Sequence, residues 1–326
     1  MAKIFTKLNP ADIVASIGGR SFKKLSRDIP KQDGGYLTFS SPSGFTFSVV
    51  DGKKYWDGTL ECSLDAINWG TWDGTSTVVA LDGKLYVRGT GNTYITGEGA
   101  TSSNGAWRFN GSNISISGNI ENLLDYATVA KGEHPTMADQ AFRVLFAYPF
   151  SEEDYTGGDE NRTITDASNL ELPAMTLTAG CYWAMFQGCL GLKTAPALPA
   201  KTLAETCYAH MFALCDLTVA PSLPATTLAW GCYIRMFRRC KNLTTIPSLP
   251  AVTLSADCYW HMFEGCSKIV LSTSKTESCT TAYRIPTSGS GITATDAMLN
   301  MFNDTGGTFT GTPSINTTYY TSNTVV

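Results

Sequence analysis

A nine-residue motif occurs four times in the middle of the chain, and it constrains the fold more than any other feature. Each copy reads Cys-Tyr-x-x-Met-Phe-x-x-Cys, and the copies occupy residues 181–189, 207–215, 232–240 and 258–266. Their first cysteines are separated by 26, 25 and 26 residues. A unit this short cannot bury its own apolar side chains, so units of this length fold by stacking on their neighbours. The four copies therefore predict a repeat architecture.

The spacing within the motif favours a helix. On an α-helix the five fixed positions fall within an arc of about 140°, whereas on a strand they would scatter over both faces. The third, fourth and seventh residues would then point outward. Between motifs, Pro-x-Leu-Pro-Ala-x-Thr-Leu predicts a short extended segment, because each proline fixes φ and disfavours helical geometry in the residue before it. These segments are 196–203, 221–228 and 247–254.

Two weaker copies of the motif flank the four strong ones, at 141–149 (AFRVLFAYP) and 297–305 (AMLNMFNDT). Terminal units of a stack are expected to differ, because their outer sides meet water. One extended segment plus one helix in about 25 residues is within the length range of a leucine-rich-repeat turn. The predicted fold class is therefore α+β, with a solenoid of short strand plus helix turns over 121–304.

Residues 36–120 have the pattern of a small antiparallel β domain. Three dipeptides that supply the positive φ angles of tight hairpins separate runs of alternating apolar residues. They are Asp51-Gly52, Asp82-Gly83 and Asn110-Gly111. Residues 305–326 predict a C-terminal strand or tail.

The first 35 residues differ from the rest and predict an N-terminal docking arm. Large apolar residues lie among basic ones, and a free tail would carry fewer of them. The expected docking residues are Lys3, Phe5, Lys7, Ile13, Arg20, Phe22, Lys23 and Lys24. A basic tail that merely flanks the first domain is the alternative interpretation.

The ten cysteines of this 326-residue chain are interpreted as buried thiols. The N-terminal residues contain no apolar run typical of a signal peptide, which predicts folding in a reducing cytoplasm. On a helix the two cysteines of one motif would lie about 12 Å apart, too far to bridge. Disulfides between successive repeats and a metal site are the less favoured alternatives, and no Cys-x-x-Cys pair is present.

Charge and motifs argue against several function classes. A net charge of −4 gives no overall basic field for nucleic acid, and no segment is apolar enough to insert into a membrane. The three histidines, His134, His210 and His261, do not cluster in the sequence, and no hydrolase, zinc-protease or phosphate-loop motif occurs. No enzyme activity, cofactor or metal is therefore predicted. The acidic insertion at 151–165 fits a solvated loop better than a calcium loop.

The outward positions of the predicted helices carry the candidate binding residues. They are Trp183, His210, Ile234, Arg235, Trp260 and His261. Large aromatic and cationic side chains in such places are typical anchors for a glycan or a protein. The alternative is that they pack against an adjacent turn or a sister subunit.

The motif CYxxMFxGC followed by LTTxPxLPAxTL resembles the BspA-like leucine-rich repeats of surface proteins from gut Bacteroidetes and from the phages that infect them. The stretches LECSLDAINWG and LYVRGTGN resemble the domain that often precedes such repeats, so the resemblance covers roughly 45–304. It implies a leucine-rich-repeat fold. Since bacterial members usually carry an export signal, the architecture favours a phage head or tail fibre or decoration protein over a bacterial cell-surface adhesin.

In this interpretation the arm binds other virion proteins, of the capsid or the tail. The repeats bind a glycan or protein of the host surface. The protein is expected to be made in the host cytoplasm, to reside in the virion and to form a homo-oligomer.

Overall fold

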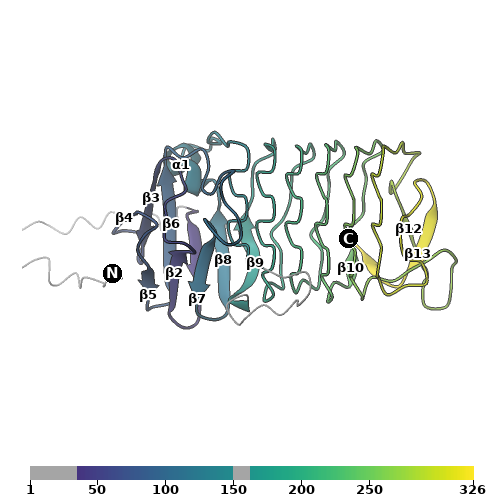
Figure 1. The fold of residues 1–326 in the computed structure, drawn as a ribbon, viewed down its shortest axis with the longest axis horizontal. Coiled ribbons are helices and arrows are strands. Elements are labelled where there is room, and N and C mark those ends of the chain that lie inside the picture. Colours follow the sequence, from purple (N-terminus) through teal and green to yellow (C-terminus); the bar gives the residue numbers. More distant parts are fainter. Residues whose placement is uncertain (1–34, 150–161) are drawn as a thin grey trace, which may run out of the picture.

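The computed structural model describes residues 35–149 and 162–326, and strands at one end of an elongated body lead into a stack of coils (Figure 1). A six-stranded sheet has the order β4-β3-β6-β1-β8-β9, and a three-stranded sheet has the order β5-β2-β7. Their strands are β1 (Leu37–Ser40), β2 (Phe45–Val49), β3 (Thr59–Ser63), β4 (Gly70–Trp72), β5 (Val78–Ala80), β6 (Lys84–Thr90), β7 (Trp107–Asn110), β8 (Ile114–Asn119) and β9 (Ile164–Glu171). Neighbours are antiparallel except β8 and β9, which are parallel.

Aromatic side chains fill the space between these two sheets. Phe39 of β1 and Phe47 of β2 stack with ring centroids 5.6 Å apart. Trp72 of β4 and Trp107 of β7 lie 4.5 and 5.0 Å from the Phe47 ring. All four are buried, and buried residues alternate with half-buried ones along β1 and β2. This alternation places one side of each sheet in a shared core.

Asp51-Gly52 and Asp82-Gly83 lie between strands and Asn110-Gly111 lies at the end of β7, but the hairpins predicted there are wrong. β2 pairs with β5 and β7, whereas β6 and β8 both pair with β1. Asp82-Gly83 therefore leads from β5 in one sheet to β6 in the other, and Asn110-Gly111 leads from β7 to β8 in the same way. Gly83 has a φ of +70°, a conformation that glycine adopts without strain. The local turn is a property of the dipeptide, but the pairing of the strands depends on the packing of two sheets.

The predicted fold class, an α+β solenoid with a helix in each turn, is wrong, and so is the leucine-rich-repeat turn that the resemblance implies. Within the described ranges there is one helix, α1 (Asn122–Val129), so the structure is 3% helical and 24% strand. The four motifs are runs of turns. The remaining strands form separate small sheets: β10 (Thr245–Ile246), β11 (Leu271–Ser272), β12 (Thr281–Arg284), β13 (Thr318–Thr321) and β14 (Thr324–Val325).

Left-handed residues spaced four apart explain why the motif is not helical. Gly180, Ala184 and Gly188 have φ angles of +60°, +52° and +76°, whereas an α-helix needs φ near −63° at every residue. The later motifs have left-handed residues at the same positions: Thr206, His210 and Leu214, then Gly231, Arg235 and Arg239, then Asp257, His261 and Gly265. Each motif is therefore a ribbon of consecutive turns.

The backbone hydrogen bonds of this ribbon alternate between its own coil and the next. The Tyr182 N–H donates to the Cys207 carbonyl of the next coil at 3.0 Å, while the Trp183 N–H donates to the Gly180 carbonyl of its own coil at 3.0 Å. The same alternation continues through the later motifs. Every second donor thus needs the neighbouring coil for its partner, which ties the coils together edge to edge.

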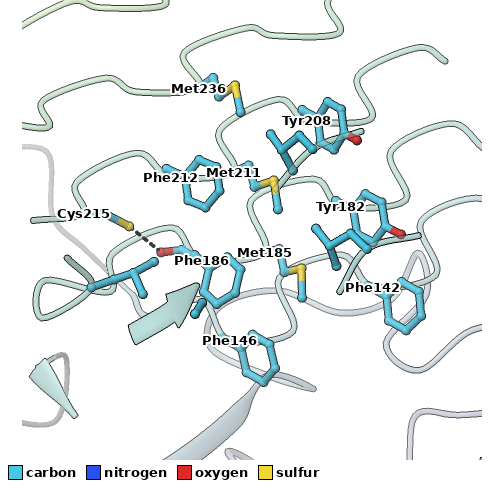
Figure 2. Close-up of a cluster of buried hydrophobic side chains, with 14 of the residues drawn as sticks. Phe142, Phe146, Tyr182, Met185, Phe186, Tyr208, Met211, Phe212, Cys215 and Met236 are labelled. Atoms are coloured by element: carbon cyan, nitrogen blue, oxygen red, sulfur yellow. Dashed lines mark hydrogen bonds between the residues drawn. The ribbon is translucent and has the colours of Figure 1, made fainter. Parts of the chain in front are cut away.

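The ribbon turns two residues inward and the next two outward, so the Cys-Tyr and Met-Phe pairs are buried in every strong copy. Like side chains stack, with the Phe186 and Phe212 ring centroids 5.8 Å apart (Figure 2). This column also contains Phe146, Phe237, Phe263 and Phe302, and a second column contains Phe142, Tyr182, Tyr208, Tyr233 and Tyr259. The two weaker copies therefore form the ends of the same stack.

The proline-containing segments and the C-terminal strands complete the coils. Thr176, Thr202 and Thr227 of successive proline-containing segments form parallel bridges. β13 pairs with β11 and β12, and β14 lies parallel to β10. The C-terminus consequently lies beside the third strong repeat (Figure 1).

All ten cysteines are free and buried, so the burial predicted for the motif thiols is confirmed. The second cysteine of each motif also links two coils. Cys215 Sγ lies 3.2 Å from the Phe186 carbonyl oxygen to which it donates (Figure 2), and Cys240 and Cys266 make the same bond at 3.1 and 2.9 Å. A small, polarizable side chain suits a position where adjacent coils approach closely.

Alkaline unfolding between pH 9 and 12 is expected from these thiols. Burial raises the pKa of Cys181, Cys189 and Cys266 from 9.0 to about 12. The folded protein therefore holds these protons more tightly than the unfolded chain. The resulting stability is fully present below pH 9 and is lost as the pH rises toward 12. Near-ultraviolet circular dichroism during a pH titration measures the transition, and a return to pH 7 controls for chemical damage. A tertiary signal unchanged at pH 12 would contradict the expectation.

Thr206→Gly is expected to raise the free energy of unfolding by about 1 kcal/mol. Thr206 is β-branched and has a φ of +48°, whereas Gly180 and Gly231 hold the equivalent positions in the adjacent coils. The reverse change, Gly231→Ala, should destabilise, because Gly231 has a φ of +60°, which is strained for alanine. Urea denaturation measures both variants. A Thr206→Gly protein less stable than the wild type would show that this backbone is not strained.

Candidate binding face

The outward-facing pairs of the stacked ribbons form one face of the protein, which we call the ribbon face. A Cβ on Gly231 would lie 2.7 Å from Ile234 Cδ1 and 3.3 Å from Thr206 Cγ2. The positions just before the motif therefore point to the same side as its third residue. Its main side chains are Arg143, Trp183, His210, Trp230, Ile234, Arg235, Arg238, Trp260, His261, Glu264 and Asn300. All six binding residues predicted from the sequence belong to this set.

Trp183 is held between side chains of the two adjacent coils. The Arg143 guanidinium carbon lies 4.2 Å from the Trp183 ring centroid, and the His210 ring centroid lies 5.6 Å from it on the other side. Arg143 is oriented by a 2.6 Å hydrogen bond from Nη1 to Gln140 Oε1. A cation over an indole ring is attracted by its electron-rich face. Trp183 is consequently half-buried and packs against adjacent turns, as the alternative interpretation expects.

Trp260 has the same relation to the coil before it. The Arg235 guanidinium carbon lies 4.8 Å from the Trp260 ring centroid, and the His261 ring meets Trp260 edge-on at 4.6 Å. His261 Nδ1 lies 2.7 Å from Glu264 Oε2, and Arg238 Nε donates to that same oxygen at 2.9 Å. These five side chains form one connected cluster.

The charges of this cluster are fixed by its neighbours. Burial lowers the pKa of His261 from its usual value; Glu264 opposes the shift, and the charges of Arg235 and Arg238 reinforce it. Burial alone would raise the pKa of Glu264, but Arg238 and His261 lower it overall. The cluster therefore presents a carboxylate that is held by the Arg238 guanidinium and the His261 imidazole. Asn300 of the next coil extends it, with Nδ2 3.4 Å from His261 Nε2.

Trp230 is the most exposed tryptophan of the seven, at 49% of its full accessible area. Its Nε1–H donates to Asp257 Oδ2 of the next coil at 2.9 Å, which fixes the direction of the ring. Glu205 holds the equivalent position in the coil before, since Gly180 N–H and Thr206 N–H bond the carbonyls of Glu205 and Trp230 respectively. The ring therefore presents an open aromatic surface beside the Asp257 carboxylate.

Sequence reasoning missed Trp230 because it precedes its motif by two residues. The signal that could have found it is the four-residue period of the ribbon. Trp230 lies four residues before Ile234, the third residue of its motif, so the two residues point to the same side. Ile234, which is at that third position, is buried and packs toward Gly231. It supports the face and offers no anchor. The predicted docking residues and the acidic residues of the insertion lie outside the described residues.

Other features bear on function only narrowly. His210 contacts Trp183 and His261 contacts Glu264, so the structure does not bring these two histidines together. In the parts of the chain that the structure covers, no cluster of three or more histidine, cysteine or acidic side chains could hold a metal ion. None of the described helical segments has the length and apolarity to cross a membrane.

Comparisons of the chain with protein-family models, with curated proteins and with solved structures found no match.

Proposed function

We propose that the protein is a structural component of a bacteriophage virion, a head or tail fibre or a decoration protein, that binds the host surface through its ribbon face. The observation that carries the proposal is the fixed array of aromatic and charged side chains on a stack whose coils are hydrogen-bonded to one another. Tryptophan and arginine dominate the energetics of binding surfaces. Side chains already ordered before binding lose little entropy when a ligand arrives. The ligand is a glycan or a protein of the host cell surface.

A binding role, without catalytic activity or cofactor, fits the chemistry of the face. Catalytic groups converge on a space that a reacting atom can occupy. On the ribbon face His261, Glu264 and Arg238 contact one another instead. The charged groups give this part of the surface a defined polarity, which recognition of a partner requires.

The location in the virion is supported by the resemblance of the motif to BspA-like repeats and by the basic, apolar composition of residues 1–35. We propose that this arm binds capsid or tail proteins, that the protein is made in the host cytoplasm and that it assembles as a homo-oligomer. A bacterial cell-surface adhesin of the same family is the alternative. The ribbon face would bind in both cases, and the two differ in what the arm does.

Deletion of residues 1–34 tests the virion assignment. We expect the shortened protein to keep its melting temperature and to be missing from purified phage particles, as measured by quantitative mass spectrometry. Full-length Trp230→Ala protein is the matched control and should be incorporated normally. Particles that contain the shortened protein at the wild-type level would rule out the arm as the attachment element. Absence of the full-length protein from particles would rule out the virion assignment and favour the adhesin.

A further inference from the structure

A cavity of about 330 Å³ lies at the first coil of the stack, and a buried carboxylate lines it. Glu121, just before α1, provides the carboxylate. Residues 134–137 and 174–178 form the other walls, with His134, Met137, Met175, Thr176 and Thr178 among the lining side chains. The ribbon face does not include this cavity, and no sequence motif pointed to it.

The Glu121 carboxylate is only partly compensated. Its side chain is 4% exposed, and its two oxygens lie 3.1 and 2.8 Å from a single nitrogen, Nδ1 of the largely exposed His134. A carboxylate can accept about four hydrogen bonds, and one imidazole N–H supplies only one. Burial raises the pKa of Glu121, and His134 opposes this shift without cancelling it. The negative charge is therefore costly where it lies, and a group that brings a positive charge into the cavity would stabilise it.

We propose that this cavity binds a primary alkylammonium group. An ammonium group has three N–H donors and a compact charge, which match the unused lone pairs of Glu121. The side chains of Met137 and Met175 offer apolar, adaptable contacts to an alkyl stem. The hydroxyls of Thr176 and Thr178 can accept the remaining N–H groups. An anion would be repelled, and a neutral alcohol would leave the charge of the carboxylate uncompensated. This inference does not depend on the proposed function.

Two sources could supply such a group, a lysine side chain of a partner protein and a free alkylamine. Isothermal titration of the full-length protein with n-butylammonium chloride tests the shared chemistry, with 1-butanol and butyrate as neutral and anionic controls. We expect n-butylammonium alone to bind. Nα-acetyl-lysine N-methylamide then separates the sources. If it also binds, the cavity accepts a lysine side chain; if only n-butylammonium binds, the ligand is a free amine.

Glu121→Gln should weaken n-butylammonium binding about tenfold to a hundredfold, the usual effect of removing a charge-assisted hydrogen bond. Glu133→Gln is the matched control, because it makes the same charge change at an exposed residue outside the cavity lining. Should Glu121→Gln fail to fold, Met175→Trp decides, since Met175 is 49% exposed and a larger side chain there would fill the cavity. Equal affinity in Glu121→Gln or Met175→Trp would overturn the proposal. So would equal binding of 1-butanol, or no binding of n-butylammonium to the wild type.

Discussion

Phe212→Ala is expected to lower the free energy of unfolding by about 3–5 kcal/mol. The Phe212 ring is fully buried and stacks between Phe186 and Phe237, with centroid distances of 5.8 and 5.9 Å. Its removal leaves a cavity that opens toward both adjacent coils. These coils cannot collapse into the gap, because the hydrogen bonds between them fix their separation. In a stack held together by nearest-neighbour interfaces, the substitution should destabilise both adjacent coils.

Urea denaturation followed by tryptophan fluorescence and by far-ultraviolet circular dichroism measures the Phe212→Ala effect. Phe212→Leu keeps an apolar side chain at this site and should cost less. Thr202→Ala, at an exposed position of the same coil, should change the free energy by no more than about 0.5 kcal/mol. A Phe212→Ala protein as stable as the Thr202→Ala protein would mean that the aromatic column does not hold the stack together.

The sequence predicted the spacing of the repeats and the buried motif residues but not the backbone conformation. Pairs such as Tyr182 and Phe186, four residues apart, fit one face of a helix as well as a ribbon that turns two residues in and two out. The helix and the ribbon differ at the left-handed residues, and the sequence signal for a left-handed residue is weak. Gly180 favours this conformation, but Ala184 and His210 adopt it too, at a cost of about 1–2 kcal/mol each. Hydrogen bonds to the next coil offset this cost, and they exist only in the stack.

The hairpins predicted in the β region are wrong for a related reason. Asp82-Gly83 correctly indicates a turn, yet the strands on either side belong to different sheets. A dipeptide determines local φ angles and contains no information on which distant strand supplies the partner. β1 pairs with β6 and β8, and this arrangement places Phe39 against Phe47 of the other sheet.

For the ribbon face, the sequence predicted which residues lie together more accurately than it predicted how exposed they are. Outward positions of the supposed helix coincide with outward positions of the ribbon, so the six predicted residues do share a face. Trp183 and Trp260 are nevertheless covered in part by Arg143 and Arg235 of the preceding coils. That covering depends on the register between coils. The coils differ in length by an insertion or by a single residue, so their register cannot be read from one motif. Alanine at Trp183 or Trp260 should therefore reduce stability as well as any binding.

Trp230→Ala is expected to weaken adhesion to host cells by roughly thirtyfold, the loss that an interface hot spot of about 2 kcal/mol gives. The ring is half-exposed and is held in place by its hydrogen bond to Asp257. It can therefore contact the apolar face of a sugar ring or of a partner side chain without first being ordered. The cost to folding should stay at or below about 1 kcal/mol, because the substitution removes one exposed hydrogen bond and little buried area.

Flow cytometry of host bacteria incubated with labelled protein measures the adhesion, and thermal denaturation of the same samples measures the stability. Trp230→Phe keeps an aromatic surface but loses the Nε1–H donor, so it should bind between Trp230→Ala and the wild type. Val219→Ala is the matched control, because Val219 is 52% exposed, precedes the proline-containing segment 221–228 and is not part of the ribbon face. A Trp230→Ala protein that binds like Val219→Ala would remove the best exposed anchor from the ribbon face. Adhesion would then have to come from another surface, and the proposed role of the ribbon face would be wrong.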